Sequence, residues 1–254
     1  MALIDSATIE TRENMNSKVL NDVVAIETVM IPVNNKAKKL KVLWQKTRKV
    51  LYFSVKRLFD IVCSLFGILM LIPVAIVTKI CYIATGDKET IFYKQKRIGK
   101  NGKEFDFYKF RSMIPNADKA LEKILEEDKE LANEYKINKK LENDPRITRT
   151  GKILRKTSLD ELPQFINVLK GDMSVIGNRP YLPREKKDMG KYFEDIEKTK
   201  CGIVSLWAVE GRSNLSFEER LKLEQYYSHN QSLLVDIKIF FKVFKVVLFK
   251  KGAK

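Results

Sequence analysis

The longest stretch of apolar positions in the chain extends from Ile61 to Ala84 and is interrupted only by a serine, a threonine and a lysine. A helix of this length crosses a hydrocarbon layer of about 30 Å. Pro73 lies near the middle of the stretch, where a proline breaks or kinks a helix. The pattern therefore predicts a membrane helix over residues 58–85 with a helix break at Pro73.

Basic residues flank this segment on both sides. Nine lysines and arginines lie between Lys36 and Arg57, and six lie between Lys88 and Lys103. Because positive charge beside a membrane helix favours the cytoplasmic side, both ends are expected on one side, as in a re-entrant helix-break-helix. A kinked single-pass helix is the alternative. The preceding basic segment also carries Trp44 and other apolar residues, which is typical of a helix lying on anionic lipids.

Residues 91–113 predict a β-hairpin. Two runs with alternating apolar and polar positions flank Lys100-Asn101-Gly102, and Asn-Gly is a strong signal for a tight turn. In the second strand, Phe105 and Phe107 are expected to share one face.

Two further segments carry helical patterns. Residues 116–141 combine helix formers with mixed charge, which predicts an exposed amphipathic helix. Residues 233–248 place apolar side chains at helical spacing, which suits a membrane surface; packing over a sheet is the alternative. Together the elements predict an α+β, mainly helical fold. We expect a membrane protein attached by a re-entrant helix-break-helix or a kinked single-pass helix, with a small β-hairpin and membrane-surface amphipathic helices.

Composition adds a charge argument. The 254 residues are 44% hydrophobic, enough for one core, and carry a net charge of +16, which points to nucleic acid, anionic lipid or a phosphorylated substrate as a partner. The three cysteines are far apart, which argues against a disulfide framework and a structural zinc site. Residues 1–35 do not resemble a cleaved secretion signal and are expected to form a mobile extension. Residues 36–254 would then form the membrane-attached domain, with its chemistry facing the cytoplasm.

The acidic pair Asp160-Glu161 lies in residues 144–180, the stretch richest in candidate chemistry. Ser158 and Glu161 have the spacing of a helix capping box, in which the acids only complement the helix dipole. The same position at a helix N-terminus also favours an ionised carboxylate, as a nucleophile at Asp160 requires. Glu161 is a candidate ligand for a magnesium ion that would neutralise phosphate oxygens.

Four basic residues are candidates for clamping a diphosphate: Lys109, Arg111, Arg155 and Arg179. Arg179 follows Gly177 in a tight turn that would expose backbone amides to phosphate. The only histidine, His229, lies in a polar run and is assigned no catalytic role. The chain also lacks the motifs of P-loop kinases, Rossmann dehydrogenases and elbow-serine hydrolases, so these classes lose support.

From Lys56 to near its C-terminus the chain resembles the bacterial sugar transferase family, the monotopic polyprenyl-phosphate hexose-1-phosphate transferases, also called phosphoglycosyl transferases. The motifs that carry the resemblance occur in one order. They are Lys56-Arg57 with Asp60, FYKFRSM at 107–113, residues 144–180 from DPRITRTGK to GNRP, residues 202–227 from GIVSLW to LEQYY, and Asp236-Ile237-Lys238.

The resemblance implies a role for each matched residue. Asp160 would be the nucleophile that attacks the sugar-bearing phosphorus, expels UMP and holds a covalent phosphosugar. Glu161 would be its Mg²⁺-linked partner. Substrate phosphates would bind Lys109, Arg155 and Arg179, with Arg111 a weaker candidate. The resemblance also implies a monotopic membrane protein in which Pro73 marks the break of a re-entrant helix-break-helix, with both ends in the cytoplasm.

The resemblance further implies the partners: a UDP-sugar, undecaprenyl phosphate as acceptor, and anionic lipids of the bacterial inner membrane. Glucose or galactose is the expected sugar, in the first membrane step of exopolysaccharide, capsule or O-antigen synthesis; an N-acetylated aminosugar is the alternative. Association into a homo-oligomer is left open.

Four residues depart from the usual family pattern, namely Ile72, Asn178, Cys201 and Val204. They put the helix break and the placement of the nucleotide or sugar in question. Two other classes remain as alternatives: a non-catalytic membrane adaptor of a polysaccharide assembly complex and a membrane-tethered nucleic-acid binder. The second fits poorly, because a carboxylate pair among the basic residues would repel a phosphodiester backbone, and we expect no nucleic acid as a partner.

Overall fold

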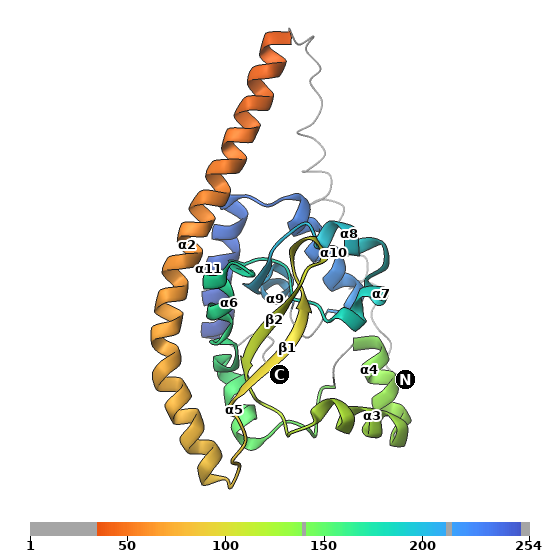
Figure 1. Cartoon of the computed structure of the whole chain (residues 1–254). Helices are drawn as coiled ribbons and strands as arrows, with labels where there is room; N and C mark the ends of the chain where they lie inside the picture. Colours follow the sequence, from red (N-terminus) through yellow and green to blue (C-terminus); the bar gives the residue numbers. More distant parts are fainter. Residues whose placement is uncertain (1–34, 139–140, 212–214, 250–254) are drawn as a thin grey trace. The chain divides into compact units, whose positions relative to one another are not determined.

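The computed structural model describes residues 35–138, 141–211 and 215–249, and the chain divides into two units, Met1–Lys49 and Val50–Lys254 (Figure 1). The predicted extension over residues 1–35 therefore falls almost entirely outside the described residues. The elements are α2 (Asn35–Ala84), β1 (Phe92–Ile98), β2 (Glu104–Phe110), α3 (Ala117–Glu127), α4 (Lys129–Asn138), α5 (Arg149–Thr157), α6 (Gln164–Lys170), β3 (Met173–Ile176), α7 (Lys186–Met189), α8 (Phe193–Ile196), β4 (Cys201–Val204), α9 (Leu206–Glu210), α10 (Phe217–His229) and α11 (Leu233–Phe249).

Helix α2 contains the predicted membrane segment. It is one helix of 50 residues that continues through Pro73, so the break expected there is absent. A proline removes one backbone hydrogen bond, and the rest of this apolar helix keeps its own ladder. Within the described residues, α2 is the one helix long and apolar enough to cross a membrane, judged by length and composition. Many of its apolar side chains are exposed; Ile72, for example, is 59% exposed.

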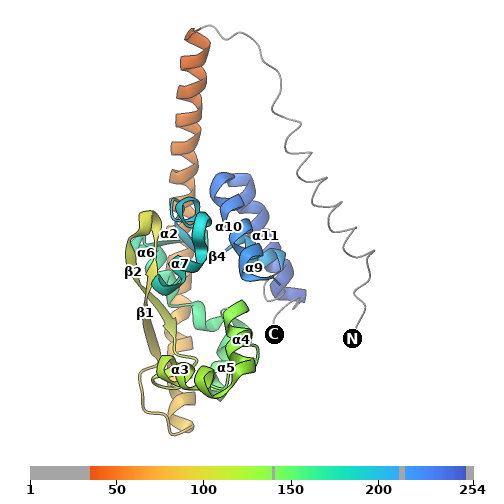
Figure 2. The ribbon, with the colours of Figure 1, turned by 90° about the vertical axis from the view of Figure 1, so that its right-hand side faces the viewer.

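The predicted hairpin is confirmed. Strands β1 and β2 pair antiparallel, with Phe92 opposite Phe110 and Ile98 opposite Glu104. The turn works because Asn101 and Gly102 both take positive φ values, 58° and 72°, which these two residue types tolerate best. Both views show α6 beside this hairpin (Figures 1 and 2).

The helix predicted over residues 116–141 is two helices, α3 and α4, separated at Asp128. The Asp128 backbone is extended, and its carboxylate accepts hydrogen bonds from the backbone N–H groups of Glu130 and Leu131. Asp128 therefore ends one helix and caps the start of the next, as an aspartate N-cap does.

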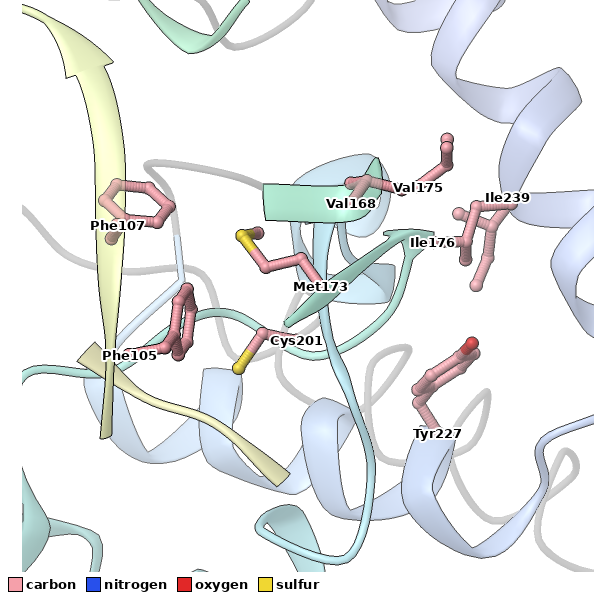
Figure 3. Packing of buried hydrophobic residues seen from close by; sticks show 9 residues of the cluster. All are labelled: Phe105, Phe107, Val168, Met173, Val175, Ile176, Cys201, Tyr227 and Ile239. Carbon is pink, nitrogen blue, oxygen red and sulfur yellow. The ribbon is translucent and has the colours of Figure 1, made fainter. Parts of the chain in front are cut away.

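The main core lies where β2, the short parallel β3–β4 pair, α10 and α11 meet. Figure 3 shows Met173 and Cys201 between the two phenylalanines of β2 and the side chains of Ile176 and Tyr227. The shared face predicted for Phe105 and Phe107 is therefore the core face, and both side chains are buried.

Helix α2 is anchored to the helix that follows the acidic pair. Arg57 donates hydrogen bonds to the carbonyl oxygens of Val168 (2.6 Å) and Leu169 (2.8 Å), near the C-terminal end of α6. An arginine suits that position because the last carbonyls of a helix lack helical partners. One turn of α2 also packs closely on α6, since a Cβ added at Gly67 would lie 2.2 Å from the ring of Phe165.

Helix α11 packs on α2 through a buried polar cluster. Lys56 forms an ion pair with Asp236 at 2.6 Å, and Tyr52 and Tyr227 also donate hydrogen bonds to that carboxylate. Core packing is confirmed for one side of α11, whereas its contact with a membrane surface stays a prediction. Ile239 is buried in the core, whereas the apolar side chains on another side, Leu233, Leu234, Ile237 and Phe241, are exposed.

Candidate functional site

The acidic pair lies in a short 3₁₀ turn, Leu159–Glu161, between α5 and α6. Ser158 takes a left-handed conformation with φ 58° at the end of α5, and its side chain caps no backbone group. The predicted capping box is therefore wrong, because a capping residue needs an extended backbone to aim its hydroxyl at the helix. Spacing alone did not reveal the left-handed residue.

Lys109 on β2 links the two carboxylates. Its Nζ lies 3.4 Å from Asp160 Oδ2 and 3.2 Å from Glu161 Oε1. The Asp160 side chain is 9% exposed and that of Glu161 is 37% exposed. The site thus holds one enclosed carboxylate and one open carboxylate, with a cation between them. This confirms that Lys109, Asp160 and Glu161 meet, and their chemical roles stay predictions.

Burial raises the pKa of Asp160 above its usual range, the nearby charge of Lys109 opposes this rise, and Glu161 adds to it. The direction is opposite to the one expected from the helix N-terminus. Asp160 is enclosed in a 3₁₀ turn rather than exposed at the end of a long helix, so removal from water outweighs the helix dipole. Lys109 is consequently the group that favours the ionised form most.

Asn167, which the sequence analysis did not single out, fixes Lys109 relative to the acidic pair. Its fully buried amide accepts a hydrogen bond from the backbone N–H of Tyr108 (3.1 Å) and donates one to the carbonyl of Asp106 (2.6 Å). The Asn167 side chain on α6 thereby forms the two hydrogen bonds that a neighbouring strand would form with β2. The only signal in the sequence is an asparagine inside a short apolar helix, which by itself is weak.

Arg155 reaches the site from α5. Its charge lowers the pKa of Asp160, and its Nε donates a hydrogen bond to Ser112 Oγ at 2.9 Å. Gly151 allows this approach, because a Cβ at that position would lie 1.9 Å from the carbonyl oxygen of Ser112. The structure thus places Arg155 close enough to act on Asp160 electrostatically.

Arg111 has a different environment. Its guanidinium forms a two-pronged pair with Asp87, at 2.9 Å for each contact, and donates to the carbonyl of Thr90. The side chain is buried and holds the start of the hairpin to its end. Binding of substrate by Arg111 stays a prediction, and its contacts are those of a residue that supports the fold.

Arg179 lies in a second group of residues. Its backbone N–H donates to Glu224 Oε2 at 2.7 Å, and its guanidinium carbon lies 5.6 Å from the centre of the Trp207 ring. In the part of the chain that the structure describes, no contact joins Arg179 to Asp160 or Glu161. The four basic candidates are thus divided between separate places, and Lys109 and Arg155 are the two beside the acidic pair.

The donor set fits a magnesium ion that is completed by a substrate. No group of three or more His, Cys, Asp or Glu side chains suitable for a metal is found among the described residues. Mg²⁺ is often held by one or two carboxylates together with phosphate oxygens and water. The open carboxylate of Glu161 beside Asp160 offers such a partial site.

Comparison with known proteins identifies relatives over most of the chain. The model of a family described as bacterial sugar transferase matches residues 51–250. The chain is 42% identical over 202 residues to the undecaprenyl-phosphate galactose phosphotransferase of Salmonella typhimurium, covering 78% of this chain and 41% of that protein. It is 40% identical to the UDP-galactose-lipid carrier transferase of Erwinia amylovora, with the same coverage of 78% and 41%.

An aminosugar enzyme is also among the similar proteins. The chain is 32% identical over 213 residues to the UDP-N-acetylgalactosamine-undecaprenyl-phosphate N-acetylgalactosaminephosphotransferase of Aeromonas hydrophila, covering 80% of this chain and 46% of that protein. In all three comparisons the chain spans less than half the length of the relative.

Proposed function

The chain belongs to the bacterial sugar transferase family, and from this premise we propose that it transfers a sugar-1-phosphate from a UDP-sugar to undecaprenyl phosphate and releases UMP. One observation carries the proposal. The fold brings Lys109 between a buried carboxylate and an open one, Asp160 and Glu161. A family member without catalysis would have no need of this arrangement.

The proposed reaction has two displacements at one phosphorus. A carboxylate oxygen of Asp160 forms a bond to the sugar-bearing phosphorus of the donor, and the bond from that phosphorus to UMP breaks. An oxygen of undecaprenyl phosphate then forms a bond to the same phosphorus, and the bond to Asp160 breaks. The products are UMP and undecaprenyl diphosphate sugar, and the carboxylate is regenerated.

The residues of the site divide the work. Lys109 favours the ionised form of Asp160 inside a buried turn, because its positive charge lowers the pKa that burial raises. Arg155 adds positive charge from the solvent side of α5. Glu161 would hold Mg²⁺ together with phosphate oxygens, and the ion would supply charge neutralisation.

The surfaces of the protein support attachment to a membrane. Apolar side chains are exposed along the Pro73 region of α2 and on α11, including Ile72, Leu234 and Phe241. Lysines and arginines flank the apolar part of α2, as expected beside anionic lipids. Although α2 continues through Pro73 in the structure, we propose that it bends at this proline in the inner membrane and returns to the cytoplasmic face. The site would then meet a soluble donor and an acceptor that stays in the bilayer.

The galactose enzymes among the relatives favour UDP-galactose or UDP-glucose as the donor, with a UDP-N-acetylaminosugar as the alternative. The test is UMP release from a panel of UDP-sugars by detergent-solubilised protein, with and without undecaprenyl phosphate and Mg²⁺. UMP release over many turnovers that needs both the lipid and the ion supports the transferase and names the sugar. Without the lipid, release is expected to stop after one UMP per protein molecule, when the covalent phosphosugar has formed. Folded protein that releases no UMP from any donor would favour the adaptor alternative.

Asp160→Asn is expected to fold and to lose turnover completely, because an amide is a poor nucleophile. Intact mass spectrometry without acceptor should find a covalent phosphosugar on the parent protein and none on the variant. Glu126→Gln, an exposed carboxylate on α3, is the matched control and should react as the parent does. Normal turnover by Asp160→Asn would remove the nucleophile assignment.

A further inference from the structure

Near the end of α2, one side chain faces the protein while its neighbours face outward. Tyr82 is 1% exposed, whereas Ile80 and Ile83 on the same helix are 60% and 58% exposed. The Tyr82 ring belongs to a buried apolar cluster that also contains Phe110 at the end of β2 and Leu154 on α5. The apolar helix is therefore joined, at this residue, to two elements that carry basic residues of the candidate site.

The hydroxyl group of Tyr82 lies where β2 ends and α5 begins. It donates a hydrogen bond to the carbonyl oxygen of Arg111, and its oxygen lies 3.4 Å from the hydroxyl oxygen of Thr148. The guanidinium carbon of Arg111 also lies 4.4 Å from the centre of the Tyr82 ring. A phenylalanine would fill the same apolar cluster, so the specific contribution of this tyrosine is its two polar contacts.

Both polar contacts of Tyr82 lead to Arg155 on α5. The residue after Arg111 is Ser112, whose hydroxyl oxygen accepts the hydrogen bond from Arg155 Nε at 2.9 Å. Thr148 is the N-cap of α5, and its hydroxyl oxygen accepts a backbone hydrogen bond from the first turn of that helix at 2.9 Å. The backbone N–H of Thr148 also donates to the carbonyl oxygen of Ser112 at 3.1 Å. The tyrosine hydroxyl thus contacts both supports of this arginine.

The position of Arg155 depends on these supports more than the position of Lys109 does. The charged groups that act on Asp160 are Lys109 from β2, Glu161 from the same turn and Arg155 from α5. Lys109 contacts both carboxylates directly. Within the part of the chain that the structure describes, Arg155 forms no ion pair with either carboxylate, and Ser112 holds its side chain. Because the energy between charges depends on their distance, the effect of Arg155 depends on how α5 is held.

We propose that Tyr82 is a positioning residue, which holds α2 against the end of β2 and the start of α5 and thereby places Arg155 beside the acidic pair. The inference rests on the proposed function, because the step that it affects is the first displacement, in which Asp160 attacks the donor and UMP leaves. A positive charge accelerates such a step only when it is already in place as negative charge develops. Tyr82 touches no reacting atom and acts through Arg155.

The test follows the first turnover of UDP-galactose, or of the donor that the panel identifies, by the full-length protein in detergent without lipid acceptor. The amount of UMP released per protein molecule counts the active molecules, whereas the rate constant reports the state of the site. Tyr82→Phe keeps the ring and removes the hydroxyl. We expect the rate constant at saturating donor to fall about twofold to tenfold and the amount of UMP to stay unchanged. A purely structural role would lower the amount and leave the rate constant unchanged.

Two further variants test the route through Arg155. Tyr226→Phe removes the hydroxyl of a tyrosine on α10 that is 46% exposed, and it should match the parent in both readouts. Ser112→Ala removes the oxygen that holds Arg155, so it should slow the first turnover by itself. Adding Tyr82→Phe to Ser112→Ala should then cause little further loss, because both changes act on the same arginine. Losses that multiply in the double variant would overturn the route through Arg155.

Hydrogen exchange separates this inference from the proposed function, because it needs no turnover. Without the Tyr82 hydroxyl, the backbone amides of residues 149–154 should exchange faster than in the parent, and those of α10 should exchange as before. Faster exchange in α5 of a protein that releases no UMP from any UDP-sugar would keep the link between α2 and α5 and remove the transferase. A first-turnover rate constant equal to that of the parent in folded Tyr82→Phe would overturn the positioning role even if UDP-sugars are turned over.

Discussion

At the residue scale, the proposed chemistry depends on a balance at Asp160 between burial, which favours the protonated acid, and Lys109, which favours the carboxylate. A nucleophile works only when it is ionised, so the rate falls as the pH drops through its pKa. The sequence identified Asp160, Glu161 and Lys109 as candidates. The opposing effects of burial and charge depend on the 3₁₀ turn, which buries Asp160 and leaves Glu161 exposed.

Lys109→Met should move the acidic limb of kcat/KM to higher pH. Lys109 lowers the pKa of Asp160, so its loss raises that pKa and a higher pH is needed to ionise the nucleophile. The measurement is the pH profile of UMP release. Lys109→Arg keeps the charge and should keep the limb near its original position; a limb that is unmoved in Lys109→Met contradicts the assignment.

Glu224→Gln should change how stability depends on pH. The folded protein holds the Glu224 proton up to about pH 8, whereas the ordinary pKa is 4.5, so unfolding between these values releases a proton. Stability from this group is therefore present at low pH and is lost as the pH rises towards 8. The melting temperature of the variant minus that of the parent should therefore be larger near pH 8 than near pH 5. The same difference in melting temperature at the two pH values would contradict this.

At the scale of elements, the hairpin and the C-terminal helix were predictable because their signals are local. Asn101-Gly102 forms the turn that its residues demand, and the apolar spacing of residues 233–248 is that of a helix. The division at Asp128 and the failed cap at Ser158 were not predictable. In both places the sequence pattern is compatible with two backbone conformations of one residue. Asp128 is extended and Ser158 is left-handed in the structure.

Gly151→Ala should separate α5 from the end of β2. The new methyl group would lie 1.9 Å from the Ser112 carbonyl oxygen, so the helix must move and Arg155 must lose its hydrogen bond to Ser112. We expect a loss of about 1–3 kcal/mol in stability, as for other overpacked sites, together with reduced UMP release. Lys152→Ala, an exposed change on the same helix, is the control, and equal melting temperatures for the two variants would contradict the packing argument.

At the scale of the whole molecule, a measurement of membrane topology distinguishes a re-entrant α2 from a single-pass α2. Single cysteines at Lys46 and Lys88, both exposed, are introduced after Cys63 and Cys81 are replaced by serine; the remaining Cys201 is buried. A re-entrant helix should let a membrane-impermeant maleimide reach both positions from the cytoplasmic side of inverted vesicles. Labelling of only one position from that side would indicate a single-pass helix.

Long-range contacts set the limit of prediction. Lys109, Asp160 and Glu161 were grouped from their residue types, whereas the place of Asn167 beside β2 and of Arg220 beside Trp207 depends on how distant segments pack. Arg111 and Arg179 illustrate the same limit. The sequence analysis assigned both to one diphosphate-binding site. In the structure, Arg111 pairs with Asp87 and Arg179 lies beside Trp207.

The ion pair between Lys56 and Asp236 joins residues 180 positions apart. During synthesis the ribosome therefore delivers the apolar helix long before the carboxylate that pairs with its lysine. Contacts of such sequence separation form late and slow the folding of the chain. The acidic pair lies between the two partners in sequence, so Lys109, Asp160 and Glu161 are all synthesised before α11 can dock on α2.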